Sequence, residues 1–199
     1  MSKVIDSLPK EAEAKIEEYR ERFLNIGLST EETDRKKAED ALRRYCVYLK
    51  KTDPTVDDNP TFTWVDSPFE GIVVAAQIAK GSLNVTKDEI REQASKASFG
   101  SFEACWVATY AFIANELPVK KDELVDIAVD IVKECGVYWS FEGHYVMTPK
   151  PKVIAMKDGV LHSTYGMALA YANGDGFYSY KGERKNSLAE IALSSRNVV

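Results

Sequence analysis

The alternation of hydrophobic and polar positions changes character near residue 137. Before that point, apolar residues recur at three- and four-residue spacing, which is typical of amphipathic helices. Between residues 158 and 184, apolar and aromatic residues alternate with polar ones and glycines fall at the breaks. That pattern predicts an antiparallel meander. The sequence therefore predicts an α+β fold, in which a helical N-terminal body packs on a C-terminal antiparallel β-meander.

Start signals divide the N-terminal part into several helices. Four residues stand at positions typical of helix N-caps, namely Ser29, Ser67, Thr86 and Ser101. A glutamate three residues after each of the first three completes a capping box. The expected helices run over 10–25, 29–51, 68–80, 86–98, 101 to the turn at Pro118, and 120–135. In the helix after Ser101, Trp106, Tyr110 and Ile113 recur at helical spacing.

The strands are expected to be short. They are predicted at 61–65, 137–139, 144–148, 152–157, 160–163, 167–172 and 176–181. Strands this short cannot hold a sheet alone, so we expect the helical and β parts to share one core. A last capping box, Ser187 with Glu190, predicts a final helix, and a charged, partly frayed tail is the equal alternative. We expect one domain, 1–199, with a mainly helical part over 10–136, an antiparallel β part over 137–185 and a short helix or tail over 186–199.

The charge balance limits the class of partner. The chain has 26 lysines and arginines against 31 aspartates and glutamates, a formal net charge of -5. This argues against general nucleic-acid binding, because such affinity comes from neutralising phosphates. No basic segment followed by an apolar leader is visible, and the longest apolar run, 72–79, is too short to cross a bilayer. We therefore expect a cytoplasmic protein without a membrane partner.

Neither a metal nor a cofactor is expected. Cys46, Cys105 and Cys135 lie far apart, and no pair of them has the spacing of metal ligands. The glycines form neither a dinucleotide-binding nor a P-loop pattern. The cysteines are interpreted as buried, reduced thiols.

The junction between the strand at 61–65 and the next helix is one candidate binding place. A helix N-terminus offers free N–H groups and a partial positive charge, so Asp66 and Ser67 mark a position suited to a phosphate or carboxylate. The alternative for Ser67 is a helix cap alone. Trp64 could stack a base there. Arg35 is either aimed at an anion or ion-paired within the helix pack.

Residues suited to acid–base chemistry lie elsewhere. His162 is either a general base or ligand contact, or a hydrogen-bonded histidine that fixes a hairpin. Glu103 and Glu142 could work as an acid–base pair if they converge. Solvated or capping carboxylates are the commoner case.

Four stretches together resemble a known family. They are GLSTEETDRKKAE (27–39), TWVDSP (63–68), FGSFEACWVATYAF (99–112) and DGVLHSTYGMALAYANGDGFYSYKGER (158–184). The family is a domain of unknown function found in bacterial and phage proteins, several of which carry leucine-rich-type repeats. The resemblance runs over about 15–185 and implies a bacterial or phage source. Among the positions it marks are Arg35, Trp64, Asp66, Ser67, Glu103, Trp106, Trp139, Glu142, His162 and Arg184.

The favoured hypothesis is a non-enzymatic binding protein that captures a small anionic, nucleotide-like ligand or a protein partner. The anion would sit near Ser67, with Arg35 or Arg184 opposing it. Trp64 or Trp106 would stack on the ligand.

Two further hypotheses stay open. One is an enzyme acting on a nucleotide or nucleic acid, with His162 and either Glu142 or Asp66 as acid and base. The other is a structural or protein-interaction module that could form a homodimer.

Overall fold

Helices fill most of the chain up to residue 134 and strands dominate the rest, which confirms the α+β class. The computed structural model describes residues 7–196, so the ends of the expected domain lie outside it. The helices are α1 (Lys10–Glu13), α2 (Ile16–Gly27), α3 (Arg35–Lys50), α4 (Pro68–Lys80), α5 (Lys87–Ala94), the 3-10 helix η1 (Gly100–Glu103), α6 (Ala104–Glu116), α7 (Glu123–Glu134) and α8 (Leu188–Arg196). The strands are β1 (Thr61–Trp64), β2 (Tyr138–Phe141), β3 (His144–Met147), β4 (Val153–Ile154), β5 (Met156–Lys157), β6 (Val160–Leu161), β7 (Leu169–Ala170), β8 (Gly176–Tyr180) and β9 (Glu183–Lys185).

Two of the expected helix starts are confirmed in detail. Ser67 caps α4, because its hydroxyl accepts a hydrogen bond from the N–H of Glu70 at 3.3 Å. Thr86 and Glu89 form the reciprocal capping box of α5. Gly81 ends α4 in the left-handed conformation, at a φ of 67°. Capping chemistry that lies within a few residues was therefore readable from the sequence.

The two other expected starts are wrong. α3 begins directly after Asp34, whose carboxylate accepts the N–H of Lys37 at 3.1 Å. Ser29 instead accepts the N–H of Glu31 at 3.3 Å, which closes a local turn outside any helix. Ser101 lies inside η1, and within residues 7–196 its buried hydroxyl has no hydrogen-bond partner.

Two expected helices are interrupted or shortened. The helix expected over 10–25 breaks between α1 and α2, where the N–H of Lys15 bonds to the carbonyl of Ala12 at 3.0 Å in the tighter 3-10 manner. α5 ends before Ser98, because Ser98 exchanges two backbone hydrogen bonds with Tyr138, at 2.8 and 2.9 Å. The early end of α5 follows from a contact with a distant strand, and helical periodicity in the sequence does not report such contacts.

The strands expected at 137–139 and 144–148 form the β2–β3 hairpin, which joins β1 in a sheet of the order β1-β3-β2. β3 is the central strand, antiparallel to β2 and parallel to β1. The parallel register places Phe62 opposite Tyr145. The crossover from β1 to β3 passes through four α-helices, α4 to α7, and was not expected from the sequence.

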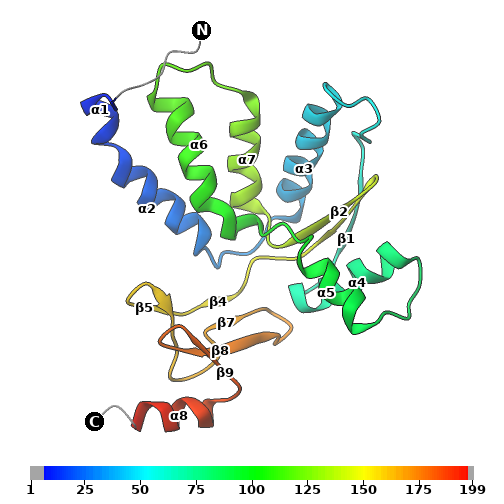
Figure 1. Ribbon diagram of the computed structural model, residues 1–199, viewed down its shortest axis with the longest axis vertical. Coiled ribbons are helices and arrows are strands. Elements are labelled where there is room, and N and C mark those ends of the chain that lie inside the picture. The colour runs from blue at the N-terminus through cyan, green and yellow to red at the C-terminus, as the bar shows by residue number, and fades with distance from the viewer. Residues whose placement is uncertain (1–6, 197–199) are drawn as a thin grey trace.

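The central strand β3 is buried on both faces. Tyr145 and Met147 belong to a cluster with residues of α3 and α7. Val146 points to the opposite face, where it packs with Trp139 and residues of α4. A third cluster, around Phe23, joins α2, α6 and α7. Figure 1 shows the result as a row of helices, α2, α6, α7 and α3, at one end of the molecule.

The later strands form a second sheet, of the order β4-β7-β8-β9, beside the β5–β6 hairpin. Helix α8 packs on β8 and β9 at the end of the molecule opposite the helical row (Figure 1). Two contacts tie this sheet to the start of α4. The hydroxyl of Ser67 donates to the carboxylate of Asp175, and the Phe69 ring meets Tyr171 edge-on, with centroids 6.5 Å apart.

The close approach of η1 to the end of α7 generates one prediction. Gly100 has a φ of +49°, and a Cβ on it would overlap the carbonyl oxygen of Gly136. Gly100→Ala should lower the free energy of unfolding by about 2–4 kcal/mol, from left-handed strain and overpacking combined. Gly81→Ala is the matched control, because it has a φ of +67° and open space around it, and should cost about 1 kcal/mol. Equal losses in urea unfolding would contradict the close approach.

The contact of Ser67 with Asp175 generates a second prediction. Asp175→Ala leaves the buried hydroxyl of Ser67 without its acceptor, and should cost about 1–3 kcal/mol of unfolding free energy. Asp175→Asn keeps an acceptor and should cost less than Asp175→Ala. Asp88→Ala, at an exposed position whose side chain contacts only the next turn, should change stability by a few tenths of a kcal/mol. Thermal unfolding of the three variants measures the order, and an Asp175→Ala variant as stable as Asp88→Ala would refute the linkage.

Candidate functional site

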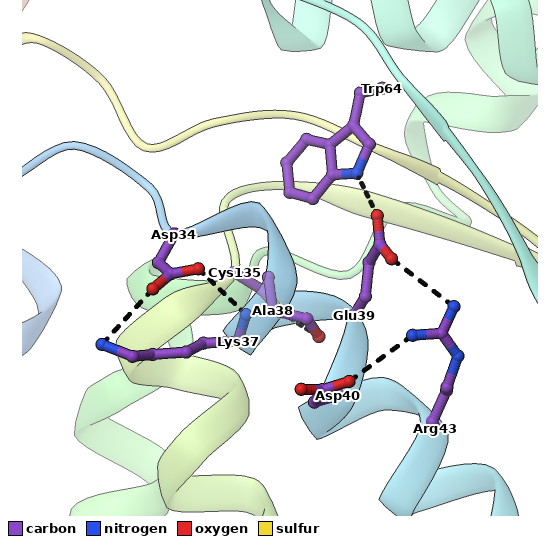
Figure 2. A network of polar contacts seen from close by, with 8 residues as sticks. All are labelled: Asp34, Lys37, Ala38, Glu39, Asp40, Arg43, Trp64 and Cys135. Carbon is purple, nitrogen blue, oxygen red and sulfur yellow. Dashed lines mark hydrogen bonds and ion pairs between the residues drawn. The ribbon is translucent and has the colours of Figure 1, made fainter.

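Arg35 and Trp64 lie together where α3 crosses the end of β1. The guanidinium carbon of Arg35 is 5.1 Å from the centroid of the indole ring. The indole Nε1 donates to Glu39 at 2.9 Å, and Glu39 also faces Arg43 at 3.5 Å (Figure 2). Asp40 contacts the same arginine at 3.5 Å. The indole N–H is thus already bonded and one ring face is covered, so this network braces α3 against β1.

Cys135, which directly follows α7, packs against α3 close to this network. The thiol of Cys135 points at the carbonyl of Ala38, with 3.8 Å between sulfur and oxygen (Figure 2). Burial raises the pKa of this thiol to about 12. Cys135 therefore stays protonated near neutral pH and is a structural residue, as expected from the sequence. Cys46 is also buried, but the expectation is wrong for Cys105, which is exposed on α6.

At the N-terminus of α4, a carboxylate of the chain itself occupies the position expected for an anion. Ser67 is fully buried and donates to Asp175. The N–H of Asp66 donates to Glu70 at 3.0 Å. Two carboxylates, those of Glu70 and Asp175, therefore lie at this helix end. The helix charge that favours an anion is balanced from within the chain.

The four residues considered for acid–base chemistry come from separate elements, and Glu103 is the last residue of η1. Glu142 is in the turn of the β2–β3 hairpin, Asp66 precedes α4, and His162 follows β6. The N–H of Lys181 donates to Nδ1 of His162 at 3.1 Å, and the imidazole lies 4.9 Å from the ring of Tyr180. These contacts fit the structural alternative for His162, a histidine that fixes a hairpin.

Arg184 and Trp139 each make contacts of their own. The guanidinium of Arg184 lies 5.4 Å from the ring of Phe177, across β8 and β9. Trp139, a residue of β2, is buried, and its Nε1 donates to the carbonyl of Gln93 in α5 at 2.9 Å. The helix α4 approaches it so closely at Gly71 that a Cβ there would lie 2.6 Å from the indole ring. Trp139 therefore serves the core.

Glu103 and Trp106 are the two expected site residues that line one cavity together. This cavity is an apolar groove of about 440 Å³ between α6 and α7, with an end at Tyr45 and Tyr138. Its other lining residues are Val107, Tyr110, Asp122, Leu124, Val125, Ala128, Ile131 and Val132. Glu103 accepts the N–H of Phe99 at 3.2 Å, which fixes its carboxylate at the N-terminal end of α6.

Helix α6 is apolar on all sides. Its inner side carries Ala104, Ala111 and Phe112 into the third core cluster. On its outer side, Trp106 is 70% exposed and Tyr110 63% exposed, and Ile113 is also exposed. No charged residue occurs from 104 to 115. A helix that is hydrophobic all round is usually covered on all sides, yet this one leaves an aromatic ridge open.

Sequence reasoning located Trp106 but missed the groove beside it. The helical spacing of Trp106, Tyr110 and Ile113 was visible, and spacing does not tell an inward face from an outward one. The missed signal was the lack of any charged residue on the opposite side of the helix. Of the twelve groove residues, the sequence analysis singled out Glu103 and Trp106 alone as site residues, and it missed Tyr110 and Asp122 among the others.

Within residues 7–196, no group of three or more histidine, cysteine, aspartate or glutamate side chains is arranged to hold a metal ion. No helix in that part of the chain has the length and apolar character to cross a membrane.

Comparisons with known proteins do not add a relative. No family model matches the chain. No curated protein and no solved structure matches it either. The resemblance described from the sequence motifs thus stays a prediction, and the site has to be argued from its own geometry.

Proposed function

We propose that this chain is a non-enzymatic binding protein that docks an apolar helix of a protein partner in the groove between α6 and α7. The observation that carries the proposal is the exposure of Trp106 and Tyr110 on a helix that has no charged residue from 104 to 115, directly beside an apolar groove. Contiguous apolar surface of this kind on a water-facing helix marks an interaction site.

The area of the ridge supports a specific contact. Aromatic side chains offer roughly 150–250 Å² each, so the exposed parts of Trp106 and Tyr110 supply on the order of 250 Å². Ile113, three residues after Tyr110 on the same helix, is exposed as well. A partner covering this face would bury two aromatic anchors, which are the side chains that dominate protein interfaces.

The charges around the groove favour a particular partner chemistry. Two charged residues line it, Glu103 near the start of α6 and Asp122 at the start of α7, and both are acidic. Asp122 accepts hydrogen bonds from Leu124 and Tyr48, which hold its carboxylate in place. An apolar helix with lysine or arginine at its ends complements this rim.

The same acidic lining makes a protein partner the better choice over a small anion. An anionic ligand in the groove would meet two carboxylates, and one at the start of α4 would meet those of Glu70 and Asp175. Like charges at close range lower affinity rather than raise it. A protein partner was part of the favoured hypothesis from the sequence, and the groove supports that branch of it.

A peptide titration tests the proposed function. The probe is a synthetic helix about as long as α6, with leucines along one face and lysines at both ends, and a scrambled peptide is its control. The chain is kept dilute while the peptide is titrated, and binding is followed by microscale thermophoresis. We expect saturable micromolar binding, weakened at least about tenfold in Trp106→Ala/Tyr110→Ala because both anchors are removed.

Tyr165→Ala is the matched control. Tyr165 is 94% exposed and lies outside the groove, so its loss should leave peptide binding unchanged. Failure of the wild-type chain to bind, equal binding of the scrambled peptide, or equal loss in Tyr165→Ala would reject the α6 face as a docking surface.

A further inference from the structure

We infer that a second groove, between α2 and α6, binds a monocarboxylate with an apolar body, a ligand of the fatty-acid class. Figure 1 shows α2 and α6 side by side in the helical row. The two grooves have no lining residue in common, since this one lies on the side of α6 that meets α2. The inference therefore goes beyond the docking surface and does not depend on it.

The α2–α6 groove has the size and the lining of a small-molecule site. Its volume is about 590 Å³, within the range of roughly 300–1,000 Å³ that such sites occupy. Its apolar wall is formed by Ile16, Tyr19, Phe23 and Leu24 of α2 and by Ala108 and Phe112 of α6. Gly159, in the turn between β5 and β6, lines it as well. An apolar chain in this groove removes its own surface and that of the wall from water, which favours binding.

The floor of the groove is held in place by the core. Tyr19 and Phe23 are buried, and the Phe112 ring meets Tyr19 edge-on, with centroids 5.5 Å apart. The hydroxyl of Tyr19 also donates to Glu116 at 3.0 Å. Side chains that are already fixed lose little conformational freedom when a ligand binds, so more of the gain from burial remains as affinity.

Arg20 determines the charge of the ligand. Within residues 7–196, it is the only charged residue that lines this groove. It stands four residues from both Ile16 and Leu24, so the three share one face of α2. A carboxylate at Arg20 places the body of its ligand beside these apolar neighbours. The lining thus complements a single negative charge, in contrast to the acidic lining of the α6–α7 groove.

The guanidinium of Arg20 has donors to spare. Its Nη1 donates to the two carboxylate oxygens of Glu17, at 2.9 and 3.1 Å. In the described part of the chain, no hydrogen bond from Nη2 or Nε is seen. These two nitrogens form the planar fork that can hold a carboxylate by two hydrogen bonds. Glu17 is largely exposed, so water and salt weaken its repulsion of an incoming anion.

Calorimetric titration with decanoate tests the inference. The wild-type chain should bind decanoate saturably, and decyltrimethylammonium, which carries the opposite charge, should bind at least about fivefold more weakly. Arg20→Gln should weaken decanoate binding about fivefold, because the paired hydrogen bonds to the carboxylate are lost. Arg91→Gln is the matched control, since Arg91 pairs with an acid three residues before it, as Arg20 does, and lies outside the groove. No decanoate binding, or equal binding by Arg20→Gln, overturns the inference.

Filling the groove tests the place of the apolar body. Thr109 is exposed and lines the groove, so Thr109→Trp obstructs it without replacing a core side chain. This variant should bind decanoate at least about tenfold more weakly. Thr109→Ser keeps the groove open and should bind as the wild type does, and thermal unfolding compares the folding of both variants. Undiminished binding by a folded Thr109→Trp would place the ligand elsewhere and refute the site.

The thiol of Cys105 gives a readout on the unmodified protein. Cys105 is exposed and lines the groove, whereas Cys46 and Cys135 are buried. Saturating decanoate should slow the reaction of N-ethylmaleimide with Cys105 at least about fivefold, because the ligand covers an otherwise accessible thiol. Intact-mass spectrometry follows the reaction, and Cys105→Ser should abolish it. A rate that decanoate leaves unchanged counts against the groove as the binding place.

The two proposals fail separately. Trp106→Ala/Tyr110→Ala should bind decanoate as the wild type does, because neither residue lines the α2–α6 groove. A chain that binds decanoate but not the leucine–lysine peptide overturns the docking function and leaves this site. A chain that binds the peptide but not decanoate does the reverse. Loss of decanoate binding in Trp106→Ala/Tyr110→Ala would mean that the ligand occupies the α6–α7 groove, and would overturn the inference.

Discussion

The two-faced burial of β3 is the constraint on which the rest of the structure depends. Tyr145 and Met147 on one face hold α3 and α7, and Val146 on the other holds α4 and the buried indole of Trp139. A strand buried in this way must sit in the middle of its sheet, so β1 pairs on one side and β2 on the other. Each helix around the sheet then has only one position in which its apolar face is covered.

This constraint explains why most of the motif residues serve structure. Trp64 and Trp139 lie in the two strands that flank β3. The indole N–H of each donates a hydrogen bond to a neighbouring segment. Arg35 covers Trp64, and Ser67 joins the cap of α4 to Asp175 of the second sheet. A polar group satisfied by the chain itself is costly to redirect toward a ligand. The docking surface that we propose lies instead mainly on α6 and α7.

Helix α6 can carry the proposed docking surface because its inner side is part of the core and its outer side is exposed. Its inner side, with Ala104 and Ala111, completes the cluster around Phe23. Its outer ridge adds little to that cluster, since Trp106 and Tyr110 are mostly exposed. The stability of the body and the affinity of the ridge can therefore vary independently. This separation is compatible with the proposed docking role of α6, whose inner side packs on α2 and α7.

The sequence by itself determined the features that depend on neighbours a few residues away. The caps at Ser67 and Thr86, the stop at Gly81 and the change from helical to alternating pattern near residue 137 are local chemistry. Only the tertiary structure decided the parallel pairing of β1 with β3, the end of α5 at the bridge of Ser98, and the outward direction of Trp106. Each of these depends on which distant surface covers a residue, and periodicity records that a face is apolar without recording what covers it.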